Sequence, residues 1–417
     1  MIRLPVGSCV TVSSGSWRPE GARVKEAYVY DGDLFDAASV RNARAVDDEL
    51  RELAPVVRLS RENVTMIARY EHVAAGLRDW KTFSSTSRPW HDPKSVRPEL
   101  LLTDDPPKHT AVRAVVANAL SPQALAKMAA AFRTDAEALV TDLKARSGTV
   151  IDAVAEITRP FVYKVLPDLL GIPVPGREHM YAFGNMVWAT MGPMNELFTA
   201  AMQDTGPVIE WATSCCRREN LDSQGLGMQM FLAADRGEIT QDEAQLLVGI
   251  LLSAAADTTI ITMANAIRAF SIYPEQYQLV RQDPALVRAA FEESLRWDSP
   301  SRMAGRITMR DVEIDGVVIP RGERCGLMFA AANRDPRKWS EPDRFDVQRD
   351  NRGHVGWGYG VHSCVGRVLA GLEADALLGA VVRHIERFEP GGEPEPWMTT
   401  IGHGPEALPV RLFAATG

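Results

Sequence analysis

One long apolar stretch constrains the fold of this chain more than any other feature. Thr240 and Glu243 have the spacing of a capping box, in which the two side chains cap the first turn of a helix. No Pro follows until Pro274, which predicts a helix of roughly 33 residues and about 50 Å. Its middle, residues 246–256, is apolar nearly all round and must be buried on every side. A buried helix that carries Asp-Thr-Thr at residues 257–259 indicates a function for those polar groups.

The composition is that of a globular chain with a large core. Of its 417 residues, 46% are hydrophobic and 24% are charged. The length alone would suit two or three domains, but no internal repeat or low-complexity tract divides the chain. We expect residues 1–25, which are polar and rich in Gly, Pro and Ser, to be loosely ordered, and residues 26–417 to form a single domain. The net charge of −8 argues against sequence-independent binding to nucleic acid, which needs a basic surface.

The N-terminus and the cysteines predict a cytoplasmic protein. Pro5 and Gly7 interrupt the N-terminal sequence before an apolar run develops, so we expect no signal peptide and no membrane anchor. The longest apolar run, residues 246–256, is too short to cross a bilayer. An odd number of cysteines without framework spacing argues against a disulfide scaffold and for reduced thiols. The cysteines are Cys9, Cys215, Cys216, Cys325 and Cys364.

Helical patterns dominate the chain, and a smaller part is rich in strands. Residues 56–59 and 64–67 alternate as short strands do. Helical periodicity prevails between residues 107 and 297. Residues 312–319 then predict a hairpin that turns at an Asp-Gly pair. We therefore expect a mainly α fold with a small β region.

The most informative stretch is Gly-Trp-Gly-Tyr-Gly-Val-His-Ser-Cys-Val-Gly at residues 356–366. Alternating glycines suit a backbone loop pressed flat against something planar, where side chains would collide. The pattern is helical from residue 365 onward, so Cys364 sits just ahead of a helix N-terminus, whose N–H groups and dipole favour a thiolate. Two other interpretations stay open at this point: a buried structural cysteine in a Gly-rich turn, and a zinc site with His362. No CxxC or HxxxH partner set completes four zinc ligands.

Residues 357–366 resemble the haem-binding signature of the cytochrome P450 family, aromatic-Gly-x-Gly-x-His-x-Cys-x-Gly, with Trp357 in place of the usual Phe. The resemblance implies that the thiolate of Cys364 is the axial ligand of haem b iron. It also implies the family's fold, a triangular single domain that is mainly α, with a small β region and a long central helix. The implied activity is that of a monooxygenase, which inserts one atom of dioxygen into an organic substrate, with redox chemistry supplied by the haem.

A second group of residues resembles the family's structural core. Glu293 and Arg296 match its Glu-x-x-Arg, and at i and i+3 the two charges share a helix face. Alone, such a pair occurs on many solvated helices. Arg344, in a stretch similar to the meander before the cysteine loop, matches the family's second Arg. The resemblance implies a buried structural triad of Glu293, Arg296 and Arg344.

Residues 101–113 resemble the family's helix that binds the haem propionates. His109 and Arg113 lie at i and i+4 on one helical face, as two donors for an anionic group. Arg306 and His362 match the family's other propionate positions. The alternative for His109 and Arg113 is an ordinary solvated helix edge.

Residues 254–259 resemble the oxygen-activation motif of the family's central helix, although the family usually has Gly where Ala255 stands. The hydroxyl of Thr258 can bond back to the carbonyl of Ala254 and weaken the helix ladder locally. The resemblance implies that Asp257 and Thr258 are catalytic and deliver protons during oxygen activation. The alternative is a buried Thr satisfied by its own helix.

Resemblance to one subfamily gives the only indication of a substrate. Residues 332–349 and 353–366 are most similar to bacterial members that oxidise para-substituted benzoates, including demethylation of methoxy groups. This implies a small aromatic acid, although Ile250 departs from that pattern, in which a hydroxyl is expected. A terpenoid or another small aromatic molecule is the alternative. The segments expected to line the pocket are residues 84–97, 180–198, 251–255, 301–305 and 398–401.

Four residues of these segments are candidate substrate contacts. Arg88 would complement a substrate carboxylate, and Trp90 would wall the pocket entrance. Ser253 would offer a hydroxyl, and Ala254 would face the reaction site from the central helix. The alternative is that Arg88 faces solvent and that Ser253 bonds its own helix.

The chain has no flavin or iron–sulfur segment of its own, so electrons must come from outside. The predicted donor is a small acidic ferredoxin, reduced in turn by an NAD(P)H-dependent ferredoxin reductase. Lys108, Arg113 and Arg367 would attract it to the face nearest Cys364. Two rival functions are a peroxide-driven peroxygenase, of which fatty-acid members lack the acid–alcohol pair, and a haem protein that binds a gas without catalysis.

Overall fold

A computed structural model describes residues 25–86, 90 and 100–415. The α-helices are α1 (Ala37–Arg41), α2 (Ala43–Leu53), α3 (Tyr70–Arg78), α4 (Lys108–Ala119), α5 (Pro122–Leu125), α6 (Ala129–Leu143), α7 (Arg159–Leu170), α8 (Met180–Thr190), α9 (Glu196–Ala201), α10 (Gly206–Cys215), α11 (Leu226–Asp235), α12 (Gln241–Ile272), α13 (Pro274–Gln282), α14 (Val287–Trp297), α15 (Phe329–Ala332) and α16 (Arg367–His384). The strands are β1 (Tyr28–Tyr30), β2 (Val56–Leu59), β3 (Val64–Ile67), β4 (Phe83–Ser84), β5 (Val150–Asp152), β6 (Met303–Thr308), β7 (Val312–Ile314), β8 (Val317–Ile319), β9 (Arg324–Met328), β10 (Ile385–Pro390), β11 (Glu395–Pro396), β12 (Pro405–Ala407) and β13 (Pro409–Ala414). The expected loose segment at residues 1–25 lies, except for its last residue, outside the described range. The boundaries of the single domain stay a prediction.

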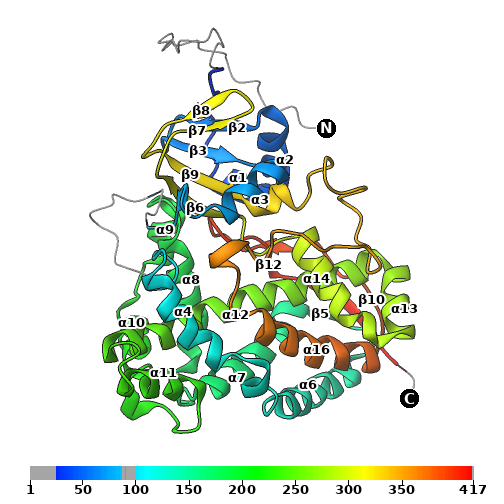
Figure 1. Ribbon diagram of the computed structural model, residues 1–417. Coiled ribbons are helices and arrows are strands. Elements are labelled where there is room, and N and C mark those ends of the chain that lie inside the picture. Colours follow the sequence, from blue (N-terminus) through cyan, green and yellow to red (C-terminus); the bar gives the residue numbers. More distant parts are fainter. Residues whose placement is uncertain (1–24, 87–89, 91–99, 416–417) are drawn as a thin grey trace.

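The largest sheet joins four strands of the first 84 residues to two strands of residues 303–328. In the described residues its order is β1-β2-β3-β9-β6-β4. The early strand β3 pairs in parallel with β9, and β9 pairs antiparallel with β6. Figure 1 shows these blue and yellow strands together above a larger body of helices. The predicted strands at 56–59 and 64–67 and the predicted hairpin are all present, as β2, β3 and the β7–β8 pair.

The predicted long helix is α12, which crosses the helical body (Figure 1). Its capping box forms as expected, because the Thr240 hydroxyl accepts from the Glu243 N–H and the Glu243 carboxylate accepts from the Thr240 N–H. By length and composition α12 could span a membrane, but it lies mostly buried inside the fold, against α7, α11, α14 and α16.

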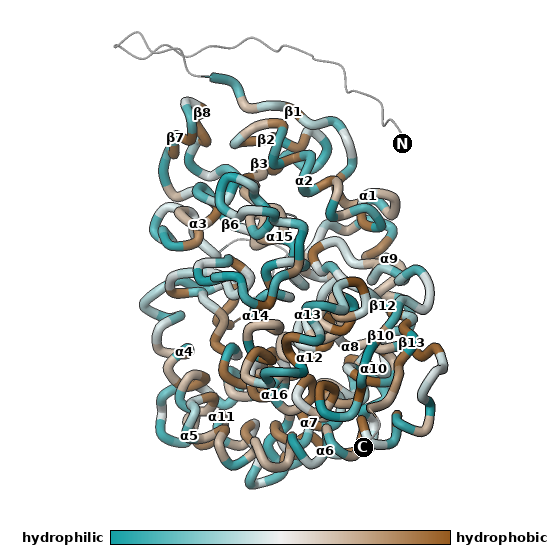
Figure 2. Tube along the Cα trace, turned by 90° about the vertical axis from the view of Figure 1, so that its right-hand side faces the viewer, coloured by the Kyte–Doolittle hydropathy of each residue, from teal (hydrophilic) through white to brown (hydrophobic). Residues whose placement is uncertain are grey.

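The hydrophobic core follows from this arrangement. Its largest cluster joins apolar side chains of α6, α7, α12, α14 and α16. Figure 2 shows hydrophobic stretches running through the helical body, with hydrophilic segments on its outer loops. The arrangement confirms the predicted fold class, mainly α with a small β region. Packing in the core also holds one face of α12 near the loop that precedes α16.

Candidate active site

A cavity of about 440 Å³ lies between α4, β6, α12 and the glycine-rich loop that precedes α16. Its volume is in the range of ligand pockets, and its wall is mostly apolar. All five segments that the sequence predicts as pocket wall contribute side chains to it. They are represented by Trp90, Trp188, Leu251, Met303 and Ile401.

The glycine-rich loop is tightly folded at the wall of this cavity. Gly358 and Gly360 both have a φ of 66°, a backbone conformation that favours glycine. A Cβ on Gly360 would lie 2.9 Å from the carbonyl oxygen of Leu77, so the loop packs directly against α3. The N–H of Cys364 donates to the carbonyl of Trp357 at 2.7 Å and closes the loop. The glycines therefore serve close backbone packing that fixes the position of the cysteine.

Cys364 exposes its thiol to the cavity although the residue lies deep within the molecule. Burial raises the pKa of this thiol, whereas the N–H groups of Gly366 and Arg367 and the charge of Arg113 oppose the rise. These N–H groups are the unpaired donors at the start of α16. The amide donors and the charge of Arg113 therefore offset part of the effect of burial on the sulfur.

Four basic side chains line one side of the cavity. They are His109 and Arg113 from α4, Arg306 from β6 and His362 from the loop. The two histidine rings have centroids 4.4 Å apart, and the two arginines each donate to a backbone carbonyl, at 2.6 and 2.7 Å. In the described part of the chain, neither arginine forms an ion pair with a carboxylate. This side of the cavity is suited to an anionic group.

The surroundings lower the pKa of both histidines. Burial lowers the pKa of His109, and the charge of Arg113 lowers it further. Burial and the charge of Arg306 bring the pKa of His362 to about 4. Both ring nitrogens of His109 are buried without a partner among the described residues, whereas Nε2 of His362 lies 3.3 Å from a carboxylate oxygen of Asp105. A buried imidazole N–H requires a hydrogen-bond acceptor, and none of the described residues supplies one to His109. Its ring is therefore free to donate to a bound group.

The central helix presents a stripe of residues to the cavity. Ile250, Ala254 and Thr258 follow one another at four-residue spacing and all line it. The Thr258 hydroxyl donates to the Ala254 carbonyl at 2.9 Å, as the sequence predicts. The hydroxyl of Ser253 lies 3.1 and 3.2 Å from the carbonyls of Gly249 and Ile250, so it bonds its own helix. The alternative interpretation of Ser253 is therefore the one that the geometry favours.

Asp257, next to Thr258, is turned away from the cavity. Its carboxylate lies so close against α8 that it leaves no room for a Cβ on Gly184. The side chains within hydrogen-bonding reach of this carboxylate are the hydroxyl of Tyr163 and the indole of Trp188. Burial raises the pKa of Asp257 to about 7, although the charge of Arg159 lowers it. A carboxyl group with this pKa exchanges its proton near neutral pH.

Comparison with known proteins identifies the family. The family model described as Cytochrome P450 matches residues 176–408. Cytochrome p450 CYP199A2 of Rhodopseudomonas palustris is 39% identical over 378 residues, which cover 88% of this chain and 90% of that protein. The chain belongs to the cytochrome P450 family. Cytochrome P450 107B1 of Saccharopolyspora erythraea is 30% identical over 90% of this chain and 96% of that protein. The solved structure of cytochrome P450 CYP109Q5 from Chondromyces apiculatus matches with a TM-score of 0.78 at 30% identity, over 93% of this chain and 99% of that chain.

As a P450, the chain is a haem-dependent oxidoreductase with haem b as its cofactor. The side chains around the cavity fit this group. A thiol is exposed at one wall, basic residues that suit propionates gather on one side, and the remaining wall is apolar. The unpartnered ring nitrogens of His109 are an independent indication that an acceptor belongs there.

The predicted structural triad of this P450 is wrong in one member. Glu293 and Arg296 form a buried bidentate pair, with N–O distances of 2.8 and 2.9 Å. The third side chain is Arg349, whose Nε lies 3.1 Å from Glu293, and not Arg344. The half-exposed side chain of Arg344 points toward solvent, and only its backbone carbonyl contacts Arg296. The reason is that Phe345, which is completely buried, takes the inward position beside it.

Trp357, which replaces the family's usual Phe, has a polar partner. Its indole N–H donates to Glu292 at 2.7 Å, and the same carboxylate contacts His354 at 2.9 Å and Arg367 at 3.0 Å. Burial alone would raise the pKa of Glu292, but the hydrogen bonds from His354 and Trp357 hold it at about 2. Glu292 carries no sequence signal of its own, because it stands beside the recognisable Glu293.

Glu373 on α16 is another cavity residue without a sequence signal. Both carboxyl oxygens are buried and have no partner among the described residues. Burial raises the pKa of Glu373 to about 8. A lone Glu at helical spacing usually faces solvent, so only the tertiary structure reveals this one as buried.

The predicted substrate contacts are only partly described. Trp90 lines the cavity and packs edge-on against Phe35, with ring centroids 4.6 Å apart. Ala254 also lines the cavity. Arg88 lies outside the described residues, and its role stays a prediction.

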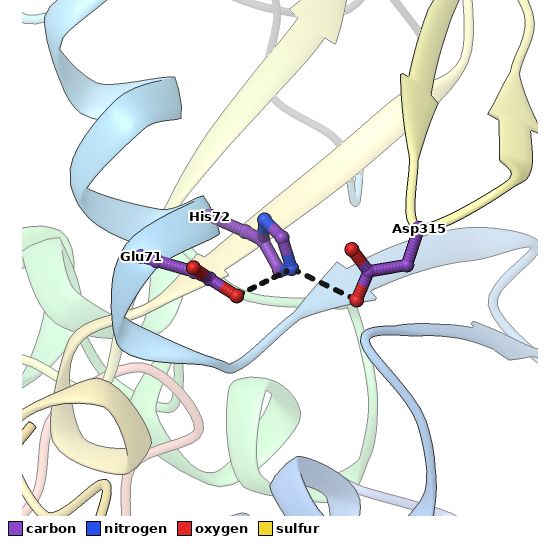
Figure 3. Close-up of side chains that lie close together, drawn as sticks. All are labelled: Glu71, His72 and Asp315. Carbon is purple, nitrogen blue, oxygen red and sulfur yellow. Dashed lines mark hydrogen bonds and ion pairs between the residues drawn. The ribbon is translucent and has the colours of Figure 1, made fainter. Parts of the chain in front are cut away.

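A cluster on the surface resembles a metal site but has another explanation. Nε2 of His72 lies 3.4 Å from Glu71 and 3.3 Å from Asp315, as Figure 3 shows. The carboxylate of Asp315 is also 3.7 Å from Arg69, and its backbone carbonyl accepts from Lys25 at 3.1 Å. These cations neutralise the cluster, which is an ion-pair network that ties α3 to the β7–β8 turn.

Proposed function

We propose that the chain is a haem-thiolate monooxygenase in which the thiolate of Cys364 would hold the haem iron. The observation that carries this proposal is the thiol of Cys364, which among the described cysteines is the one that lines the cavity, together with residues of α12. His109, Arg113, Arg306 and His362 would hold the propionates by charge and hydrogen bonds. When bound, haem b supplies the redox chemistry that activates dioxygen, and a thiolate ligand favours O–O cleavage.

We propose that Asp257 and Thr258 deliver protons to the cavity. Thr258 stands at the cavity wall with its hydroxyl on the Ala254 carbonyl, ready to exchange that bond for one into the cavity. Asp257 is one residue away, and its pKa of about 7 allows it to give up and regain a proton at neutral pH. This pair favours a monooxygenase over a peroxide-driven peroxygenase, which needs no proton supply of this kind, and over a gas-binding protein.

For the substrate, we propose a small aromatic molecule with a para substituent. The cavity wall is mostly apolar, and Trp90, Ile250 and Ala254 all contribute to it. The described basic side chains of the cavity are those assigned to the propionates, so recognition of a substrate carboxylate depends on Arg88. Recognition of the carboxylate by Arg88 would leave the para substituent free for hydroxylation or O-demethylation.

Three related compounds test this substrate proposal. Binding of 4-methoxybenzoate, its methyl ester and 4-methoxyphenol is measured by the Soret shift that accompanies displacement of water from the iron. If Arg88 recognises the carboxylate, only the acid shifts the band strongly, and Arg88→Gln abolishes that shift. A shift with the two neutral compounds but not with the acid would replace the aromatic acid by a phenol or a terpenoid.

As electron donor we propose a small acidic ferredoxin that works with an NAD(P)H-dependent reductase. Arg367, whose side chain is 59% exposed, begins α16 three residues after Cys364. Lys108 is about half exposed and pairs with Asp104 at 3.1 Å. Arg113 is turned inward, and its guanidinium donates to the carbonyl of Ser363. Its charge would therefore add to the positive electrostatic potential of this face, but the side chain would not contact the ferredoxin.

A further inference from the structure

Asp257 belongs to a buried polar cluster that has no part in the cavity wall. The titratable and charged side chains around it are Arg159 and Tyr163 from α7, Tyr181 from α8 and Glu406 from β12. Arg159 and Tyr163 are one helical turn apart and therefore share a face of α7. The cluster thus joins α7, α8 and β12 around Asp257. Its charged and tyrosine side chains do not line the cavity, although Trp188, which also reaches Asp257, does.

Two buried polar atoms of this cluster have no other partner. The hydroxyl oxygen of Tyr163 and Oδ2 of Asp257 are both buried and unbonded to any other described residue. Unpartnered buried polar groups are rare in folded proteins because each costs about 1–3 kcal/mol. Since the Tyr163 hydroxyl lies within reach of the Asp257 carboxyl, a small displacement of either side chain pairs them. Their geometry suits a contact that is made and broken.

The far end of the cluster reaches the surface. Glu406 accepts a hydrogen bond from Arg159 at 2.6 Å, and the two side chains are 27% and 23% exposed. The guanidinium of Arg159 lies over the ring of Tyr181, 4.7 Å from its centroid, and that tyrosine is 38% exposed. The partly exposed Arg159–Glu406 pair therefore lies on the solvent side of the cluster and Asp257 on its inner side, with the unpartnered Tyr163 hydroxyl as a further member.

We propose that Tyr163, with the Arg159–Glu406 pair beyond it, supplies protons to Asp257 from the surface between α7 and β12, without passage through the substrate cavity. The inference rests on the proposed role of Asp257 in proton delivery. In each transfer the Tyr163 hydroxyl gives its proton to the Asp257 carboxylate while its oxygen takes a proton from a water molecule that enters from solvent beside the Arg159–Glu406 pair. That water regains a proton from bulk solvent, so no bond to carbon changes and no tyrosinate forms. Burial, which raises the pKa of Tyr163, makes a free tyrosinate unfavourable and requires this concerted exchange. Tyr163 acts through Asp257 and is therefore a positioning residue.

The first test measures the protonation of Asp257 directly in the holoenzyme. Infrared difference spectra against Asp257→Asn assign the carbonyl band of the protonated carboxyl group, and its intensity is followed with pH. Tyr163→Phe removes a donor that stabilises the carboxylate, so the midpoint should move to higher pH. Glu406→Gln removes a negative charge, so the midpoint should move to lower pH. Shifts of opposite sign are specific to this arrangement, because a merely structural defect would not produce them.

The matched control is Tyr277→Phe. Tyr277 is also a buried tyrosine, but its hydroxyl donates to backbone carbonyls of Val381 and Ile385. This variant should leave the midpoint of Asp257 unchanged. An unchanged midpoint in Tyr163→Phe as well would overturn the proposal.

The second test is turnover. A positioned proton-transfer group contributes about 10²–10⁴-fold, so Tyr163→Phe should lower the rate of product formation by about tenfold or more and enlarge its solvent deuterium isotope effect. Substrate binding, read from the Soret shift, should be unaffected. If Asp257→Asn impairs coupling while Tyr163→Phe alters neither the isotope effect nor the midpoint, the supply route is wrong and the role of Asp257 stands. If Asp257→Asn has no effect, the proposed function of Asp257 itself fails.

Discussion

At the scale of single residues, Cys364 is the side chain on which the proposed chemistry depends most directly. Cys364→Ala should abolish the red-shifted Soret band that a thiolate-ligated ferrous haem gives with carbon monoxide, because no other described thiol faces the cavity. Cys325→Ala is the control, since Cys325 is buried in β9. Survival of the band in the Cys364 variant would refute the assignment.

Thr258 gives a second prediction at this scale. Thr258→Ala removes the hydroxyl at the cavity wall together with the γ-methyl group, and it leaves Asp257 in place. Haem content and substrate binding should stay normal, whereas product per NAD(P)H consumed should fall and hydrogen peroxide should rise, by an effect within the range of about 10²–10⁴-fold for proton transfer. Thr262→Ala, one turn further along the same cavity face, is the comparison. Equal coupling in both variants would remove Thr258 from the relay.

Glu373 predicts a pH dependence of stability. The pKa of this buried group is raised from the usual 4.5 to about 8, so the folded protein keeps a proton that the unfolded chain has lost. Stability contributed by this site is therefore full below about pH 4.5 and falls as pH rises to about 8. Glu373→Gln should flatten the urea-unfolding stability of the holoenzyme over this range, and Glu313→Gln, on an exposed position of β7, should not. A parallel pH profile in wild type and Glu373→Gln would contradict the burial of an uncompensated acid.

At the scale of elements, the cluster that joins α14 to the segment before the cysteine loop can be tested by a matched pair of arginines. Arg349→Ala leaves the buried Glu293 with one of its two cations and should lower the free energy of unfolding by about 3–5 kcal/mol. Arg344→Ala removes a half-exposed side chain and should change it by less than about 0.5 kcal/mol. Chemical denaturation measures both. A larger loss from Arg344→Ala would restore the triad expected from the sequence.

The elements that could be predicted are those whose signals are local. The capping box at Thr240 and Glu243 set the start of α12, and the Asp-Gly turn set the β7–β8 hairpin, because backbone geometry at both places depends on neighbouring residues alone. The choice between Arg344 and Arg349 is not local. It depends on which side chains an irregular segment turns inward, and no periodicity marks that direction.

At the scale of the whole molecule, the docking of an electron donor can be tested through charge. Arg367→Glu reverses a charge at the start of α16, so reduction by an acidic ferredoxin should slow, and its rate should depend less on ionic strength. Arg387→Glu, on β10, is the control. If the reduction rate changes neither with ionic strength nor in Arg367→Glu, this face is not the docking site of the electron donor.

The walls of the cavity could be listed from the sequence, but their polarity could not. Motif order placed Cys364, Arg306 and Thr258 in one site. Glu373 is buried, and Asp257 is turned away from the cavity, because of contacts between elements that are distant in the chain. The same is true of Glu292, whose carboxylate accepts from both Trp357 and Arg367. Such contacts are set by packing, which a single sequence does not express.

The two faces of α12 have a consequence for how this enzyme can evolve. Ile250 and Ala254 give the cavity its shape from one face, and Asp257 meets α7 and α8 from another. Ile250 and Ala254 are not among the side chains that contact Asp257, so substitutions at these two positions remove none of its contacts. Related enzymes can therefore diverge in substrate preference while they keep the same residues for proton delivery. Selection can then act on the shape of the cavity and on the proton supply separately.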